Sequence, residues 1–585
     1  MVAATDQSGA VELTRRAILT GVVIGAALTP CNVYSGLKIG WSFNMSIAAG
    51  LLGAGLWRLA HGMGGARPFG LLENNINQTT ASSAASIVSG GLVAPIPALT
   101  LLTGQTLGWP ALAFWVFAVS ALGIVVAAGL RRQMIVREGL RFPAGVATAE
   151  TLTRIHARGA EAAARLRLLL AGAVLSGAVK FAVELGIGAA RFAPPVTVRT
   201  GGAGAASFHN LGLAFDPSLL MIGFGAIVGL RAGVSMLLGA ALAWGAIAPE
   251  LLARGWAEAG APGAVWFGPL IAWLLWPGAT LLVVSALVSL GVSLARRRGS
   301  RRDGADDEAG DGGGPSRAAF LAALAAASAL AVAASVFLFG LGVGEAVLAV
   351  ALSFVLAAVA ARVTGETGIT PVGALGKITQ LTFGAVSPGQ VASNLMAANI
   401  TGGAAGQCAD LMDDLKCGRI VGATARHQMA AQVFGVAAGS LVGSAVYLAL
   451  IPDPRAMLIT PEWPAPAVAT WKAVAEVLSQ GFHAIPEGAV PAMGIAAVLG
   501  ILLGLGERLL PTRWARLLPS APAIGLAFVI PAWNAVSLFV GAALAALAAR
   551  LAPERAERST VPLAAGLVAG ESLVGVGFAL AGLLR

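Results

Sequence analysis

Long apolar runs separated by short polar connections make up almost the whole chain. The apolar residues in these runs are continuous, whereas the strands of a membrane β-barrel would alternate apolar and polar positions. Several runs exceed the roughly 20 residues with which a helix crosses the hydrocarbon core of a bilayer. The clearest lie at 168–190, 222–253, 270–294, 318–341, 343–361, 429–451 and 562–584. The pattern therefore predicts an all-α, polytopic membrane protein.

The composition agrees with this fold class and argues against a large soluble protein. Of the 585 residues, 57% are hydrophobic and only 11% are charged, and the mean hydropathy is +0.81. A soluble chain of this length needs a charged surface around its core, and this chain has too few charges to make one. The three cysteines, Cys31, Cys408 and Cys417, have no metal-ligand spacing and are too few for a disulfide framework. We therefore expect neither a metal site nor a cofactor.

The basic residues indicate which side of the membrane each connection faces. The net charge of +10 comes from short clusters between apolar runs, at 15–16, 131–141, 154–167 and 296–302. Such clusters mark the cytoplasmic side of a membrane protein, and they do not form the continuous stripe that nucleic-acid binding requires. With the N-terminus inside, every large cluster up to Arg362 falls on the same face. We therefore expect a multi-pass protein of the inner cell membrane.

One segment is typical of a soluble linker and divides the chain into two halves. Residues 296–317 combine basic and acidic side chains with three consecutive glycines, which predicts a charged cytoplasmic loop. The expected domains are a membrane half at 1–295, this linker, and a second membrane half at 318–585. Within the second half, the stretch 452–487 is expected to be an external hydrophilic segment.

The two halves share a short motif that suggests an internal duplication. Glu73 and Glu366 each follow an apolar helix, and each opens a segment rich in Gly, Ala, Ser and Thr. We expect the two halves to have the same orientation. Near 371–407 and 522–550 prolines and glycines interrupt the apolar pattern, so re-entrant hairpins and full spans both fit there.

Polar side chains inside the first copy form a candidate binding face. On a helix, Asn74, Asn75 and Gln78 lie close together, and amides can both donate and accept hydrogen bonds. Such a face fits the backbone of a peptide or the carboxylates of a chelate. The alternative is a helix start whose polar residues cap the backbone and whose small residues pack against a neighbour.

The second copy carries a longer set of polar residues threaded with glycine. Because prolines 371 and 388 break this segment, it is typical of a discontinuous membrane helix that exposes backbone and polar side chains at depth. We expect a cavity lining from Gln380, Asn394, Asn399 and Gln407. The charged residues that follow, Asp410, Asp413, Asp414, Lys416 and Arg419, favour a cytoplasmic loop with helix caps.

Several motifs together resemble the oligopeptide transporter family, in particular its prokaryotic branch. They are ENNINQT at 73–79, RFPAGVATAE at 141–150, GETG at 365–368, GAAGQ at 403–407 and GLVAGES at 566–572. These motifs extend over most of the chain and occur in the same order as in the family. The resemblance implies about 14–16 membrane segments built by duplication. It also implies proton-coupled import of small peptides or of metal chelates, as in the yellow-stripe-like relatives.

Proton coupling requires a carboxylate at depth, where desolvation brings its pKa toward the working pH. Glu366 is the first candidate, with Lys377 as its partner, followed by Glu73 and Glu571. Capping of a helix N-terminus is an equal alternative for Glu73 and Glu366. The expected partners are the peptide or chelate, protons, membrane lipid and, as one option, a second copy of the chain.

A channel and a membrane-embedded enzyme are the two alternatives to a secondary transporter. A channel would favour a repeated filter sequence, whereas the polar segments differ between the halves. A membrane-embedded enzyme would need a catalytic cluster, and the five scattered histidines have no i, i+4 metal-ligand partner. The sequence therefore predicts a transporter without catalytic residues.

Overall fold

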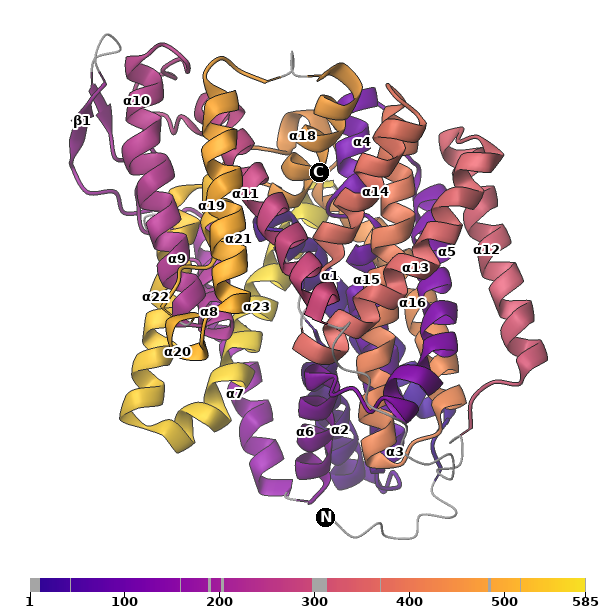
Figure 1. The fold of residues 1–585 in the computed structure, drawn as a ribbon. Helices are drawn as coiled ribbons and strands as arrows, with labels where there is room; N and C mark the ends of the chain where they lie inside the picture. Colours follow the sequence, from indigo (N-terminus) through magenta and orange to yellow (C-terminus); the bar gives the residue numbers. More distant parts are fainter. Residues whose placement is uncertain are drawn as a thin grey trace.

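The structure is a computed structural model that describes residues 11–583, except for 41, 43, 158, 188–190, 201–204, 297–312, 369, 482–484 and 516. Long helices stand side by side, with a short strand hairpin at one upper edge (Figure 1). Within the described residues, twelve helical stretches are long and apolar enough to cross a membrane. The prediction of an all-α, polytopic membrane protein is therefore confirmed. Most of the predicted linker at 296–317 lies outside the described residues.

The first part of the chain forms five helices around a short 3₁₀ turn. α1 begins where the Thr14 side chain accepts a hydrogen bond from the amide of Ala17, and it ends at Gly40 in the left-handed conformation. The elements are α1 (Arg15–Ile39), α2 (Ser46–Gly64), α3 (Leu71–Ala85), η1 (Ser86–Gly90), α4 (Pro95–Thr103) and α5 (Trp109–Arg131). Because η1 joins α3 to α4, this crossing is a broken helix.

The next part contains a helical hairpin that the apolar pattern did not predict. Its elements are η2 (Arg132–Arg137), α6 (Pro143–Ala157), α7 (Gly159–Glu184), β1 (Thr197–Arg199), β2 (Ala205–Ser207), α8 (Leu219–Val228), α9 (Leu230–Ala240), η4 (Ala241–Ile247), α10 (Ala248–Ala253) and α11 (Phe267–Arg296). β1 and β2 pair in an antiparallel manner.

The chain reverses at Gly229, which separates α8 from α9 and has φ +88°. Gly225 of α8 and Gly233 of α9 both pack against the same part of α22 (Ala532–Leu551), near Leu538 and Ala542. Two residues eight positions apart can meet the same neighbours in this way because the helix turns back on itself. The apolar run at 222–253, expected as one span, is therefore divided into two helices.

The second half of the chain begins at α12. Its elements are α12 (Arg317–Phe339), α13 (Val343–Thr367), α14 (Val372–Val386), α15 (Val391–Val421), α16 (Ala425–Leu450), α17 (Pro454–Met457), α18 (Pro466–Gln480), α19 (Ala489–Leu509), α20 (Thr512–Ala515), α21 (Ala521–Val529), α22 (Ala532–Leu551) and α23 (Pro553–Leu583). The breaks expected near Pro371 and Pro388 separate α13, α14 and α15, and the break expected after Pro522 separates α21 from α22.

α15 is the central helix of this half. It is 31 residues long and unbroken, and it packs against α5, α6, α13, α14 and α16. It is not among the twelve apolar stretches because its many polar residues lower its hydropathy. The number of 14–16 segments remains a prediction, since the twelve are counted by length and apolarity alone.

The described basic connections near α2, α3 and α6 lie at one end of the bundle (Figure 1). Arg16 and Arg67 both bind Glu73, Arg58 binds the carbonyl of Ile155, and Arg362 pairs with Glu138. These contacts join the starts of α1 and α3 and the ends of α2, α6 and α13. These described connections share one face, and the assignment of that face to the cytoplasm stays a prediction. Most of the basic cluster at 296–302 lies outside the described residues.

The stretch 452–487, expected as an external hydrophilic segment, contains a helix with a buried face. Val468, Ala469, Trp471, Ala473 and Ala475 of α18 are buried. α18 packs against α1, α4, α14 and α15, so this stretch takes part in the interior of the bundle. His483, one of the five histidines of the chain, lies outside the described residues.

Candidate functional site

A cavity of about 470 Å³ lies where the broken helices meet. One wall is the face of α15 that carries Asn399, Gly402, Gly403, Gly406, Asp410 and Asp413. The other walls come from the end of α1, from η1 and the start of α4, from the connection between α13 and α14, and from α18. These contribute, among others, Gly40, Ser42, Asn44, Ser86, Ser89, Gly91, Gly368, Thr370 and Trp471.

Small residues let polar groups come close together at this cavity. Gly91 has φ +114°, and a Cβ atom at this position would overlap the side chain of Asn399. A Cβ atom at Gly403 would lie 2.8 Å from the carbonyl oxygen of Ser89. Both positions therefore require glycine, because η1 and α15 approach each other at backbone distance here.

Asn399 is held in place by a neighbour. Its Oδ1 accepts a hydrogen bond of 2.7 Å from the indole Nε1 of Trp115 on α5. Trp115 is completely buried, so the orientation of the amide is fixed by a rigid side chain. Because Oδ1 is occupied, the NH₂ group of Asn399 is the part available to a ligand.

Asp410 and Asp413 bring negative charge to the cavity wall. Asp413 is 6% exposed, and its Oδ1 accepts a hydrogen bond of 3.1 Å from the amide of Gly145 at the start of α6. Asp410 lies beside Ser86 of η1. The interpretation of residues 410–419 as a cytoplasmic loop was therefore wrong: they continue α15, and Asp413 and Asp414 are buried.

The sequence contains a pattern that indicates where these two acids lie. The cavity-lining positions 399, 402, 403, 406, 410 and 413 are separated by one, three or four residues, which places them on one face of a helix. The acids extend a face that already carried Asn399 and three glycines. The charged neighbours Lys416 and Arg419 obscured this pattern, because a charge run usually marks a connection.

The amide face predicted on α3 does not line this cavity. Asn74 donates hydrogen bonds to the carbonyl of Gly50, 3.1 Å away, and lies 3.2 Å from Nε2 of His156. Gln78 donates to Asn75 at 3.3 Å and to Thr79 at 3.0 Å. All three amides are completely buried between helices. α3 turns them toward α2, α6, α15 and α16, and their part in substrate binding stays a prediction.

Three of the four amides predicted on α14 and α15 are also absent from the cavity lining. Gln380 accepts a hydrogen bond of 2.9 Å from Lys377 and donates to Asn394 at 3.1 Å, so it joins α14 to α15. Gln407 is completely buried, and neither of its amide atoms has a hydrogen-bond partner within the described residues. Only Asn399 of the predicted binding residues lines this cavity.

The structure does not pair Glu366 with Lys377, the expected coupling pair. Glu366 lies 3.3 Å from Arg362, one turn earlier on α13, and its side chain is 38% exposed. Lys377 is buried, where it donates to Gln380 and lies 4.2 Å above the ring of Trp471. The two residues are separated by the break at Pro371, which sends α14 away from the end of α13.

Glu73 caps the start of a helix, which is the role that the sequence offered as the alternative to proton coupling. Its carboxylate accepts hydrogen bonds from Thr14 at 2.8 Å, from Arg67 at 2.8 Å and from the Nε of Arg16 at 2.9 Å. It also lies 3.4 Å from the amide of Gly70, which precedes α3. With two arginines and a helix start as partners, this buried carboxylate is fully compensated and joins α1 to α3.

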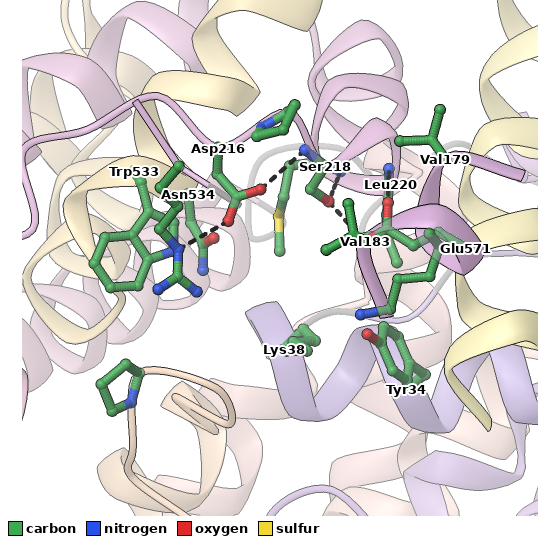
Figure 2. Close-up of a pocket in the computed structure, with 15 residues that line it drawn as sticks. Tyr34, Lys38, Val179, Val183, Asp216, Ser218, Leu220, Trp533, Asn534 and Glu571 are labelled. Atoms are coloured by element: carbon green, nitrogen blue, oxygen red, sulfur yellow. Dashed lines mark hydrogen bonds and ion pairs between the residues drawn. The ribbon is translucent and has the colours of Figure 1, made fainter. Parts of the chain in front are cut away.

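Glu571 lies in a second, smaller cavity of about 130 Å³. Figure 2 shows it against the start of α8, where it accepts hydrogen bonds of 2.8 Å from the hydroxyl of Ser218 and from the amide of Leu220. Lys38, Lys180, Arg191 and Asp216 also line this cavity. Glu571 is thus the one predicted coupling residue that lines either cavity.

An all-α bundle with a polar cavity at the junction of broken helices has the architecture of a membrane transporter. The sequence matches the family described as "OPT oligopeptide transporter protein" over residues 12–300 and 315–581. The chain belongs to this family. Members of the family are transporters, so this protein is a transporter rather than an enzyme.

Two similar proteins extend over nearly the full chain, and a third extends over part of it. The "Putative oligopeptide transporter YGL114W" of Saccharomyces cerevisiae is 24% identical, over 97% of this chain and 95% of its own length. The "Probable metal-nicotianamine transporter YSL10" of Oryza sativa is also 24% identical, over 96% of this chain and 89% of its own. A "Putative oligopeptide transporter" of Haemophilus influenzae is 32% identical over 37% of this chain and 32% of its own.

Proposed function

We propose that the protein uses the proton gradient to import small peptides, or metal chelates built from amino-acid-like ligands, across the inner membrane. The observation that carries this proposal is the pair Asp410 and Asp413 in the wall of a 470 Å³ cavity. A cavity of this volume is within the range that holds small organic ligands. The related proteins named as oligopeptide and metal-nicotianamine transporters support the same two substrate classes.

The cavity offers groups that complement both substrate classes. A peptide carries an ammonium group, which a carboxylate such as Asp410 attracts, and backbone carbonyls, which the NH₂ group of Asn399 can bind. A metal chelate carries amines, which a carboxylate can bind, and carboxylates, which an NH₂ group can bind. The indole of Trp471, which also lines the cavity, adds an apolar surface for the side chains or the carbon skeleton of either substrate.

We assign proton coupling to Asp410 and Asp413 instead of Glu366. A coupling carboxylate must reach the substrate cavity, and both aspartates line it. Glu366 is more exposed and is paired with Arg362. A charge moved with the cavity through the bilayer is costly, by roughly 2.5–3.5 kcal/mol on insertion scales. Protonation of these carboxylates from the outside removes that charge and so favours the inward step, in which the proton and the substrate cross together.

Uptake into proteoliposomes with an imposed pH gradient tests this proposal. The wild-type protein should concentrate a small peptide or a metal-nicotianamine chelate above its outside level. Asp413→Asn should abolish this accumulation while exchange of labelled substrate across the membrane persists. Glu557→Gln, at an exposed position on α23, is the control and should behave as wild type.

Two results would contradict the proposal. Movement that is only downhill in the wild type would indicate a channel. Accumulation that survives Asp410→Asn and Asp413→Asn but is lost in Glu366→Gln would return the coupling role to Glu366, as the sequence alone suggested.

A further inference from the structure

The smaller cavity, of about 130 Å³, lies where α1, α7, α8 and α23 meet. Among the described residues, it shares no lining residue with the larger cavity. Lys38 near the end of α1 lines the smaller cavity, and Gly40, two residues later, lines the larger one. Because a cavity of about 150 Å³ holds a molecule of the size of benzene, the smaller cavity has room for one small organic molecule.

Two of the three cationic side chains that line this cavity are paired with carboxylates. Nζ of Lys180 lies 2.6 Å from Oε1 of Glu184. Nε of Arg191 lies 3.2 Å from Oδ2 of Asp216, and Cζ of Arg191 lies 3.9 Å from the centre of the Trp533 ring. Each pair is neutral as a whole, so neither of them requires a charged ligand.

Lys38 and Glu571 are the two charged residues of the lining that have no such partner. Within the described residues, Nζ of Lys38 donates to the backbone carbonyl of Glu462 and lies 4.8 Å from the centre of the Trp463 ring. The Glu571 carboxylate accepts hydrogen bonds from one hydroxyl and one backbone amide at the start of α8. Lys180 attracts Glu571 only from beyond the distance of an ion pair. Both charges are therefore balanced by neutral groups alone.

The ammonium of Lys38 and the carboxylate of Glu571 can form more hydrogen bonds than these. An ammonium group has three N–H donors, and a carboxylate has about four acceptor positions. Lys38 uses one donor, and Glu571 uses two acceptor positions. Figure 2 shows the two residues on separate helices beside the same open space. The cavity thus offers one positive and one negative group to a ligand.

These charges decide which kind of ligand fits. A small anion would be attracted by Lys38 but repelled by Glu571, and a small cation would meet the opposite combination. A molecule that carries both a carboxylate and an ammonium group complements both residues. The α-amino acids carry these two groups on one carbon atom, and the smallest of them suit the volume of this cavity.

We propose that the smaller cavity is a binding site for one small α-amino acid in its zwitterionic form. The ligand carboxylate binds the ammonium of Lys38, and the ligand ammonium binds the carboxylate of Glu571. The short side chain of the ligand lies against Val179 and Val183 of α7, which belong to the lining. Such a ligand joins α1 to α23 and leaves the larger cavity free for the substrate.

Equilibrium dialysis of the purified full-length protein in detergent, with radiolabelled alanine at neutral pH, tests this site without a membrane or a pH gradient. One alanine should bind per wild-type chain. Alaninamide lacks the carboxylate, and N-acetylalanine lacks the ammonium group. Each should compete at least about tenfold less well than unlabelled alanine, because each loses a hydrogen bond between charged groups.

Two variants locate the alanine in this cavity. Glu571→Gln removes the charge but keeps an acceptor for α8, and it should weaken alanine binding at least about tenfold. Glu557→Gln, the same change at an exposed position of α23, is the matched control and should bind alanine as wild type does. Val183→Phe leaves all charges in place and fills part of the cavity from a half-buried position. It should therefore unfold at a Tm close to that of the ligand-free wild type and lose alanine binding, which guards against loss of folding in Glu571→Gln.

Four results would overturn the proposal. They are an absence of alanine binding to wild type, equal binding in wild type, Glu571→Gln and Val183→Phe, and equal competition by N-acetylalanine, which would indicate a simple anion site. The fourth is binding that is lost in Asp413→Asn but kept in Glu571→Gln, which would place the amino acid in the larger cavity. Because no gradient is applied, these outcomes are independent of the uptake experiment.

Discussion

His156 provides a test of the packing around α3 that does not depend on transport. It lies on α6, outside the twelve apolar stretches, and its Nε2 is 3.2 Å from the Nδ2 of Asn74. Since an amide nitrogen can only donate, Nε2 must accept and the ring must be neutral. Burial, with a smaller contribution from the nearby Arg58, lowers the pKa of His156 from 6.5 to about 4.

The sign and size of the effect on stability follow from this pKa. Between pH 6.5 and 4 the unfolded chain binds a proton at this histidine and the folded chain does not. Stability is therefore fully present above pH 6.5 and is lost as the pH falls through this window. With these two pKa values, the linkage relation gives a loss of about 2 kcal/mol between pH 7 and pH 5.

The measurement is unfolding of the purified protein in mixed micelles at pH 7 and at pH 5. His156→Gln keeps an acceptor for Asn74 but does not titrate, so it should lose about 2 kcal/mol less than wild type over this interval. His61→Gln, at an exposed position of α2, is the matched control and should lose as much as wild type. If His156→Gln and wild type lose equal stability, His156 is not buried as a neutral ring and the packing of α3 against α6 is wrong.

Two further substitutions test the cavity and the helix start. Gly91→Ala adds a methyl group against Asn399 at φ +114°, which should lower the free energy of unfolding by roughly 1–3 kcal/mol. It should also reduce uptake per folded molecule at least about tenfold. Unchanged uptake in proteoliposomes would exclude this cavity as the substrate site. Glu73→Gln leaves the guanidinium of Arg16 without its carboxylate, which should lower the free energy of unfolding by roughly 1–3 kcal/mol. Uptake per folded molecule should stay the same. A variant of unchanged stability that loses pH-driven accumulation would assign Glu73 to proton coupling.

The helices were predictable where membrane burial depends on local sequence. The run at 318–341 became α12, Arg317–Phe339, and the run at 343–361 became the first part of α13, Val343–Thr367. A helix in lipid needs only enough consecutive apolar residues, and this property can be counted along the chain. The run at 222–253 satisfied the same count, but apolarity contains no information about the reversal at Gly229.

The candidate site was less predictable because an amide or a carboxylate has the same sequence context in two different roles. Gln380 was expected to face a cavity, yet its bonds to Lys377 and Asn394 join two helices. Asn399, five residues after Asn394, faces the cavity because Gly91 leaves room for it. The neighbouring segment decides which role each amide has. For Asn399 this neighbour is the segment around Gly91, about 300 residues away in the sequence, and for Gln380 it is the adjacent helix α15.

The polarity of α15 explains why the cavity lies beside it. A helix with Asp410, Asp413 and Asp414 along its length could not face lipid, so it must be enclosed by its neighbours, and α5, α6, α13, α14 and α16 enclose it. A carboxylate can be enclosed by protein only where a hydrogen-bond donor, a cation or a cavity lies beside it. Asp413 has the amide of Gly145 and the cavity, and Asp410 has Ser86 and the cavity. Asp414 has the side chains of Gln78 and Ser46. The same cost therefore places two of these acids where a substrate can reach them and encloses the third between α15 and its neighbours α3 and α16.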